Sequence, residues 1–222
     1  MNYSQIQKAV GKEAFRRQVA YVAEAHTVID VGAWIGQTVN GYRRLYPKAQ
    51  IHAFEPQPRQ FDRLVRRFAG ASDTTIWSMA MSNWTGTQTL HVTEPGYETS
   101  LLEPTSEYLA TGICRRQDVR VTTTALDTFC QQQGIDRIDV LKMDVQGNEL
   151  RVLQGARGLF DRDCVGLVFA ELNFCHKYEG QCWWYDVGAW LAGYGFELRE
   201  LAPQWRQSRA VHANGLFFKE VS

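Results

Sequence analysis

The sequence predicts an α/β fold in which a mostly parallel sheet is covered by helices on both faces. Short apolar runs alternate along the 222 residues with segments whose apolar residues have helical spacing. Some runs, such as Val165–Leu172, are strongly apolar, as strands buried on both faces of a parallel sheet are. Because strands that alternate with helices pair in parallel through crossover connections, these observations together predict the fold class.

The first half of the chain begins with an expected amphipathic helix, since Ser4–Glu24 carries apolar residues at spacings of three to four. Two short apolar runs, Val28–Val31 and Ile51–Phe54, then predict strands, and a third strand is expected over Thr75–Met79. Segments of helical pattern follow the first two strands, one ending at Tyr46 and the other over Arg59–Phe68.

The middle of the chain departs from this alternation. Thr87–Val92 and Val119–Thr123 alternate polar and apolar residues, which predicts a small antiparallel β insertion around residues 86–124. Between them, Glu94–Gln117 contains two prolines and two glycines and is expected to be a lid-like loop over residues 94–117. The alternation then resumes, with strands over Asp139–Val145, Val165–Leu172, Phe196–Leu201 and Gly215–Phe218 and helices over Asn148–Gly155 and Tyr185–Tyr194.

Composition limits the classes of partner. Residues 1–222 suit one domain, and no repeat or low-complexity linker divides them. Lys plus Arg and Asp plus Glu number 24 each, so the basic excess that nucleic acid or an anionic membrane calls for is missing. We find no secretory pattern, no run of about 20 apolar residues and no CxxC pair among the five cysteines. The sequence therefore predicts a cytoplasmic protein with reduced thiols and no nucleic-acid or membrane partner; it does not indicate the oligomeric state.

Carboxylates end four of the predicted strands: Asp30, Glu55, Asp144 and Glu171. In an open parallel sheet, ligands bind beyond the carboxyl ends of the strands. These four side chains are therefore expected to lie at the edge of the sheet where a ligand binds.

The turn Asp30–Gly36 after the first strand indicates which ligand. Its glycines, Gly32 and Gly36, let the backbone turn sharply, but they do not follow the G-x-G-x-x-G spacing of a dinucleotide site. An acid before the turn disfavours pyrophosphate and favours an ammonium group, while Glu55 is placed to accept the hydroxyls of a ribose. A ligand with a ribose, a cationic amino-acid part and no phosphate is S-adenosylmethionine. An NAD-dependent oxidoreductase is the less favoured alternative.

Five segments together resemble the FkbM family of S-adenosylmethionine-dependent methyltransferases, in order and spacing as well as content. They are VIDVGAWIGQT (Val28–Thr38), HAFEPQPRQFDRL (His52–Leu64), MAMSN (Met79–Asn83), TTALDTF (Thr123–Phe129) and DVLKMDVQGNELRVLQGA (Asp139–Ala156). The resemblance implies a class I methyltransferase sheet of seven strands with the last one antiparallel, and O-methylation as the usual activity.

Carried onto this sequence, the resemblance implies that Asp30, Gly32, Gly36 and Glu55 contact the cofactor and that Met79–Ser82 lies along the adenine. The chain departs from the family at two positions, with Trp34 in place of Asn and Gln146 in place of the Glu of a D-V-E-G motif. Gln146 cannot act as a base or bring charge to a metal. The expected cofactor-binding set is Asp30, Gly32, Ala33, Trp34, Gly36, Glu55, Pro56, Ala80, Met81 and Asp144.

Methyl transfer to an alcohol needs a group that removes the proton of the hydroxyl. Asp144, Glu171 and His176 are the candidate catalytic residues, because they follow strands that end near the expected methyl group. Asp144, Glu171 and Asn173 are also oxygen ligands of the kind Mg²⁺ prefers, but without a dense acidic cluster a divalent metal is not favoured.

A saccharide or another small molecule is the expected acceptor. The aromatic group Trp183, Trp184, Tyr185 and Trp190 offers faces that stack on a sugar ring, although core packing is the commoner role for Trp190 at least. Thr99 and Ser100 in the predicted lid are placed to approach the methyl group. A non-catalytic domain that binds S-adenosylmethionine is the alternative from another class, and the sequence does not identify the acceptor.

Overall fold

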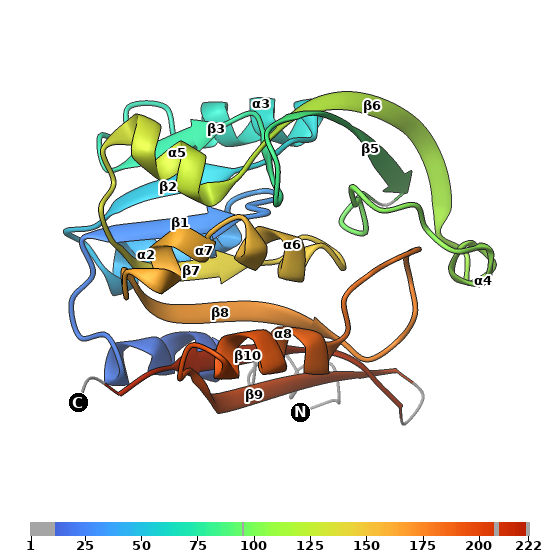
Figure 1. Cartoon of the computed structure of the whole chain (residues 1–222). Coiled ribbons are helices and arrows are strands. Elements are labelled where there is room, and N and C mark those ends of the chain that lie inside the picture. The colour runs from blue at the N-terminus through green and yellow to red at the C-terminus, as the bar shows by residue number, and fades with distance from the viewer. Residues whose placement is uncertain (1–11, 95, 207–208, 221–222) are drawn as a thin grey trace.

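The computed structural model of the chain describes residues 12–94, 96–206 and 209–220. A seven-stranded sheet runs through the molecule in the order β3-β2-β1-β7-β8-β10-β9 (Figure 1). In this spatial order, each adjacent pair among β3, β2, β1, β7 and β8 is parallel. Strand β10 is antiparallel to both of its neighbours, β8 and β9. The strands are β1 (Thr27–Val31), β2 (Gln50–Phe54), β3 (Thr74–Trp77), β7 (Ile138–Met143), β8 (Val165–Asn173), β9 (Glu197–Arg206) and β10 (Arg209–Phe218). The predicted fold class and the antiparallel last strand are confirmed.

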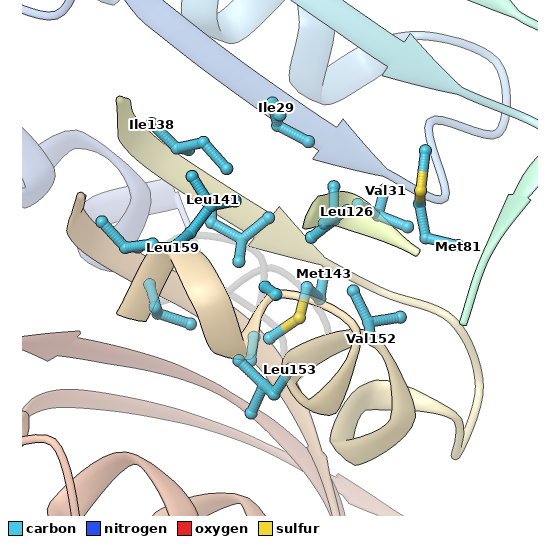
Figure 2. Close-up of a cluster of buried hydrophobic side chains, with 14 of the residues drawn as sticks. Ile29, Val31, Met81, Leu126, Ile138, Leu141, Met143, Val152, Leu153 and Leu159 are labelled. Carbon is cyan, nitrogen blue, oxygen red and sulfur yellow. The ribbon is translucent and has the colours of Figure 1, made fainter. Parts of the chain in front are cut away.

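Helices cover both faces of this sheet, so the domain has three layers. One face packs against α5 (Leu126–Gln133), α6 (Glu149–Gln154), α7 (Arg157–Asp161) and α8 (Trp184–Ala192), and Figure 2 shows part of this core. The other face packs against α2 (Gln37–Leu45), α3 (Pro58–Arg67) and the N-terminal segment around Ala14. Alternate residues of β1 point to opposite faces, with Ile29 in the first core and Val28 in the second.

A second sheet of three strands, in the order β4-β6-β5, confirms the predicted β insertion. Its strands are β4 (Ala80–Met81), β5 (Gly86–Glu94) and β6 (Cys114–Thr124), and between β5 and β6 lies the short helix α4 (Ser106–Leu109). In Figure 1 the β5–β6 hairpin arches away from the main sheet toward α4. The prediction of a loop reaching residue 117 was wrong, because β6 already pairs with β5 from Cys114 onward.

Several smaller differences concern the ends of elements. Residues 12–16 are helical and continue into the 3₁₀ turn η1 (Arg17–Ala20), while the start of the predicted N-terminal helix lies outside the described residues. Helices α5 and α7 were not predicted from periodicity, since each shows only two or three apolar positions.

Within the described ranges, no helix is both long enough and apolar enough to cross a bilayer.

Candidate active site

A cavity lies beyond the carboxyl ends of β1, β2 and β7, where the fold class predicts a ligand site. We call its two sides the sheet wall and the loop wall. The sheet wall comprises residues 31–34, 54–57, 79–81, 142, 144–146 and 148, and the loop wall comprises residues 96, 97 and 99–101. Of the expected cofactor-binding set, the sheet wall contains Gly32, Ala33, Trp34, Glu55, Pro56, Ala80, Met81 and Asp144.

The turn after β1 is held by the backbone of its neighbours. Gly32 has a φ of 81°, and a Cβ there would lie 2.0 Å from the carbonyl oxygen of Asp144, so only glycine fits. The amides of Gly32 and Ala33 both donate to the carbonyl of Phe54. Gly36 does not line the cavity; it begins α2 with a φ of 78° and packs against Phe68. The turn is therefore fixed before any ligand binds.

A buried ion pair lies beneath this turn. Asp30 and Lys142 are 0% and 4% exposed, and the Lys142 ammonium lies 2.9 Å from Asp30 Oδ1. Lys142 also donates to the carbonyl of Gly32 at 2.7 Å, while the Thr38 hydroxyl donates to Asp30 Oδ2. Burial alone would lower the pKa of Lys142, but the carboxylates of Asp30 and Asp144 raise it above its ordinary value. Asp30 thus supports the turn from below and does not itself face the cavity.

Glu55 at the end of β2 faces the cavity, and main-chain amides already occupy some of the acceptor positions of its carboxylate. Its oxygens accept the main-chain amides of Trp34 and Gln57, both at 2.9 Å. A carboxylate has about four acceptor positions, so two remain for a ligand. Burial raises the pKa of Glu55 to about 7, although the two amides act in the opposite direction. The side-chain oxygen of Gln57, also on the sheet wall, is buried and finds no hydrogen-bond partner in the part of the chain that the structure describes.

Asp144 and Glu171, two of the candidate catalytic residues, meet at one amide group. Gln146 Nε2 donates to Asp144 Oδ1 at 2.8 Å and to Glu171 Oε2 at 2.9 Å. Asp144 lines the cavity, whereas Glu171 is buried behind it and is not part of either wall. Burial raises the pKa of Glu171 well above its ordinary value, and the charge of Asp144 adds to the effect. Asp144 and Glu55 are the two carboxylates among the described residues that line the cavity.

The loop wall is anchored by the segment that follows β8. Lys177 forms a buried ion pair with Glu98 at 3.3 Å, and the Tyr178 hydroxyl donates to the carbonyl of Glu98 at 2.8 Å. Main-chain bonds join Thr105 to Lys177 and Glu179 to Glu103. The loop wall is thus a built surface, and it presents Tyr97, Thr99 and Ser100 to the cavity. The prediction that Thr99 and Ser100 approach the site agrees with this placement.

His176, the third candidate catalytic residue, lies elsewhere. It is exposed, and its ring stacks on Trp183 with centroids 6.0 Å apart. Trp183 in turn stacks on Tyr185. None of these described residues lines the cavity. The sequence places His176 correctly in the crossing segment but does not show which way its side chain points.

Sequence reasoning missed Lys142, Gln57 and Asn148 as parts of the sheet wall. Lys142 could have been found, because a cation inside an otherwise apolar strand must have a buried partner. For the metal alternative, the described residues contain no group of three or more His, Cys, Asp or Glu side chains that could hold an ion. Because Asp144 and Glu171 both accept hydrogen bonds from the Gln146 amide, we do not assign them as metal ligands.

A family model for the methyltransferase FkbM domain matches residues 30–207. The chain belongs to the FkbM methyltransferase family. The match spans β1 to β9 and therefore includes both walls of the cavity. It confirms the family resemblance found in the sequence, and with it that the chain is a methyltransferase.

Relatives of this FkbM chain are also methyltransferases. It is 27% identical over 187 residues to the 2-O-methyltransferase NoeI of Sinorhizobium fredii, covering 79% of this chain and 76% of that protein. Among solved structures, the methyltransferase FkbM from Methylobacillus flagellatus has a TM-score of 0.52 at 15% identity over 88% of this chain. This chain spans 43% of that longer protein.

The fold extends beyond the FkbM family. Magnesium protoporphyrin IX methyltransferase from Synechocystis, solved with bound S-adenosylmethionine, has a TM-score of 0.52 at 10% identity and matches 99% of this chain and 85% of its own. At this identity the likeness concerns the fold alone. It confirms the class I methyltransferase architecture.

Proposed function

We propose that this FkbM methyltransferase binds S-adenosylmethionine on the sheet wall and methylates a hydroxyl group of a saccharide or another small molecule. The observation that carries the proposal is the placement of the two cavity carboxylates, Glu55 at the end of β2 and Asp144 after β7. Glu55 is placed to bind the cofactor, and Asp144 is placed to take a proton from the acceptor. The name of the relative NoeI, a 2-O-methyltransferase, supports oxygen as the atom methylated.

The residues of the sheet wall fit the cofactor. Glu55 keeps two acceptor positions for the ribose hydroxyls, and the buried oxygen of Gln57 has no hydrogen-bond partner among the described residues. Met79, Ala80 and Met81 supply the apolar surface that an adenine ring needs. Lys142 is already paired with Asp30, so the wall offers no uncommitted cation for a pyrophosphate. These features favour S-adenosylmethionine over a dinucleotide.

When bound, S-adenosylmethionine supplies a methyl group on a positively charged sulfur; as the acceptor oxygen bonds to this carbon, the carbon–sulfur bond breaks and its electron pair goes to sulfur. Asp144 is the proposed base and takes the proton of the acceptor hydroxyl on its carboxylate. Tyr97, Thr99 and Ser100 on the loop wall orient the acceptor and exclude water.

The direct test combines binding with turnover. We expect the protein to bind S-adenosylhomocysteine and to transfer a labelled methyl group to at least one member of a panel of mono-, oligosaccharide and hydroxylated small-molecule acceptors. Asp144→Asn should bind S-adenosylhomocysteine normally but lose about 10²- to 10⁴-fold in kcat, because the general base is gone. Assays with chelator and with Mg²⁺ examine the metal alternative.

Two outcomes would contradict this proposal. Binding of S-adenosylhomocysteine without transfer to any acceptor would favour a non-catalytic binding domain. A fully active Asp144→Asn variant would show that another group removes the proton. Glu171→Gln and His176→Ala serve as comparison variants, since neither residue lines the cavity.

A further inference from the structure

Gln146 occupies a strained position on the sheet wall, where it contacts the loop wall. It follows β7 with a φ of 54°, and Gly147 after it has a φ of 93°. A residue other than glycine in this region costs on the order of 1–3 kcal/mol and persists only where its surroundings hold it. Gln146 is also 7% exposed, so every polar atom of its side chain needs a partner.

The contacts of Gln146 fix the orientation of its amide. Both hydrogens of Nε2 point to carboxylates, one to Asp144 and one to Glu171. The flipped orientation would place the amide oxygen against the same two acceptors, which would repel it. The amide oxygen lies 3.2 Å from the Tyr178 hydroxyl, whose single hydrogen is shared with the closer carbonyl of Glu98. The main-chain oxygen of Gln146 accepts the Ser100 hydroxyl at 2.8 Å.

Several ionisable groups of both signs surround the two carboxylates that this amide binds. The negative charges of Asp144, Glu149 and Glu98 raise the pKa of Glu171, and the positive charge of Lys177 lowers it. Glu98 already pairs with Lys177, as Asp30 does with Lys142. The side chain of Gln146 itself contacts Asp144, Glu171 and Tyr178. The titratable and charged groups that interact with these two carboxylates from the surrounding elements are Glu149, Glu98, Lys142, Lys177 and His212, the last 3.6 Å from Glu171.

We propose that Gln146 is a positioning residue for methyl transfer, whose neutral amide holds the Asp144 carboxylate in place as the base and joins it to the loop wall through Ser100. The inference rests on the proposed function, in which Asp144 takes the proton of the acceptor hydroxyl. A carboxylate at position 146 would stand between two others and raise their affinity for protons. The amide instead donates one hydrogen bond to each of them, which holds both carboxylates in place without adding a charge.

Three variants test the proposal. Gln146→Glu adds a carboxyl group to the pair, and Gln146→Met removes both donors while keeping the length of the side chain. Gln60→Glu is the matched control, because Gln60 is a buried glutamine on α3 outside the cavity. The measurements are the pH profile of kcat, the affinity for S-adenosylhomocysteine and the urea unfolding of each variant between pH 5.5 and 8.5.

We expect the acidic limb of the kcat profile to move up by about one pH unit or more in Gln146→Glu, because three carboxyl groups then share one site. Gln146→Met should lose about 10- to 100-fold in kcat at every pH, as misplaced catalytic groups do. Affinity for S-adenosylhomocysteine should stay within about twofold in both variants, since only the orientation of the base changes. Gln60→Glu should keep the wild-type profile.

An unshifted acidic limb in Gln146→Glu, or full kcat in Gln146→Met, would overturn the proposal, because a merely structural glutamine would change stability and leave the profile in place. The unfolding series does not depend on activity. If Gln146→Glu loses stability relative to the wild type as the pH rises from 5.5 to 8.5, the charge placement is correct. If the unfolding series shows this pH dependence but no acceptor reacts, the result counts against the proposed function alone. A stability difference between variant and wild type that does not change with pH would count against the role of Gln146.

Discussion

The two walls of the cavity are held in different ways. The sheet wall consists of the ends of adjacent parallel strands, and main-chain contacts and the buried Asp30–Lys142 pair fix it. The loop wall belongs to an irregular connection between β5 and β6 and is anchored to a distant segment by the Glu98–Lys177 pair. Substitutions that disturb the main-chain turn or the buried pair of the first should therefore affect folding and cofactor binding together, whereas those at the surface of the second should affect the acceptor alone.

Gly32→Ala should have the largest effect. The new Cβ would lie 2.0 Å from the carbonyl oxygen of Asp144, and φ is 81°. We expect a loss of more than about 3 kcal/mol in the free energy of unfolding and no binding of S-adenosylhomocysteine. Gly70→Ala is the control, because Gly70 has a φ of 79° but, apart from its chain neighbours, no described residue has an atom within 4 Å of the position that a Cβ would take, so only about 1 kcal/mol is expected. Equal effects of the two substitutions would refute the steric explanation.

Lys142→Met should come next. It leaves Asp30 buried without its cation, which typically costs about 3–5 kcal/mol. Urea unfolding measures the loss. The double variant Asp30→Asn with Lys142→Met should recover part of it, because no uncompensated charge then remains; a double variant that is no more stable than Lys142→Met would contradict the role of the pair.

Glu55 should make cofactor binding depend on pH. Burial raises its pKa to about 7, and only the ionised carboxylate can accept both ribose hydroxyls. Affinity for S-adenosylhomocysteine should therefore rise as the pH increases from about 6 to 8 and then level off. Glu55→Gln should bind about 10- to 100-fold more weakly at pH 8, as the loss of charge-assisted hydrogen bonds predicts. Its affinity should vary little with pH, and calorimetric titration of both proteins checks this.

Tyr97→Ala should have the smallest effect and one confined to the acceptor. The Tyr97 ring is 49% exposed and packs edge-to-face on Trp34 across the cavity. We expect the acceptor KM to rise about 3- to 10-fold, the size of an aromatic contact, with the melting temperature and cofactor affinity unchanged. A large loss of cofactor affinity would show that the two walls are not independent.

The same division explains what could be predicted from the sequence. Strand ends are encoded locally, so the apolar runs before Glu55 and Asp144 were enough to place both carboxylates at the cavity. The start of β6 was missed because its first five residues, from Cys114 to Asp118, are exposed and show no alternation. The Glu98–Lys177 pair joins residues that are 79 positions apart, and no local pattern reports such a contact. The direction of the His176 side chain was beyond prediction for the same reason.

The β5–β6 hairpin leaves and re-enters the domain at neighbouring points. The amide of Ser82 donates to the carbonyl of Thr124 at 3.0 Å, and Gly86 lies opposite Thr123 in the register. A segment with such closely spaced ends can be exchanged as a whole between related genes without lengthening or shortening the rest of the sheet. An incoming segment would need an acid that pairs with Lys177, as Glu98 does here. If the loop wall orients the acceptor as proposed, recombination at these two points would change the acceptor and leave the proposed cofactor site on the sheet wall in place.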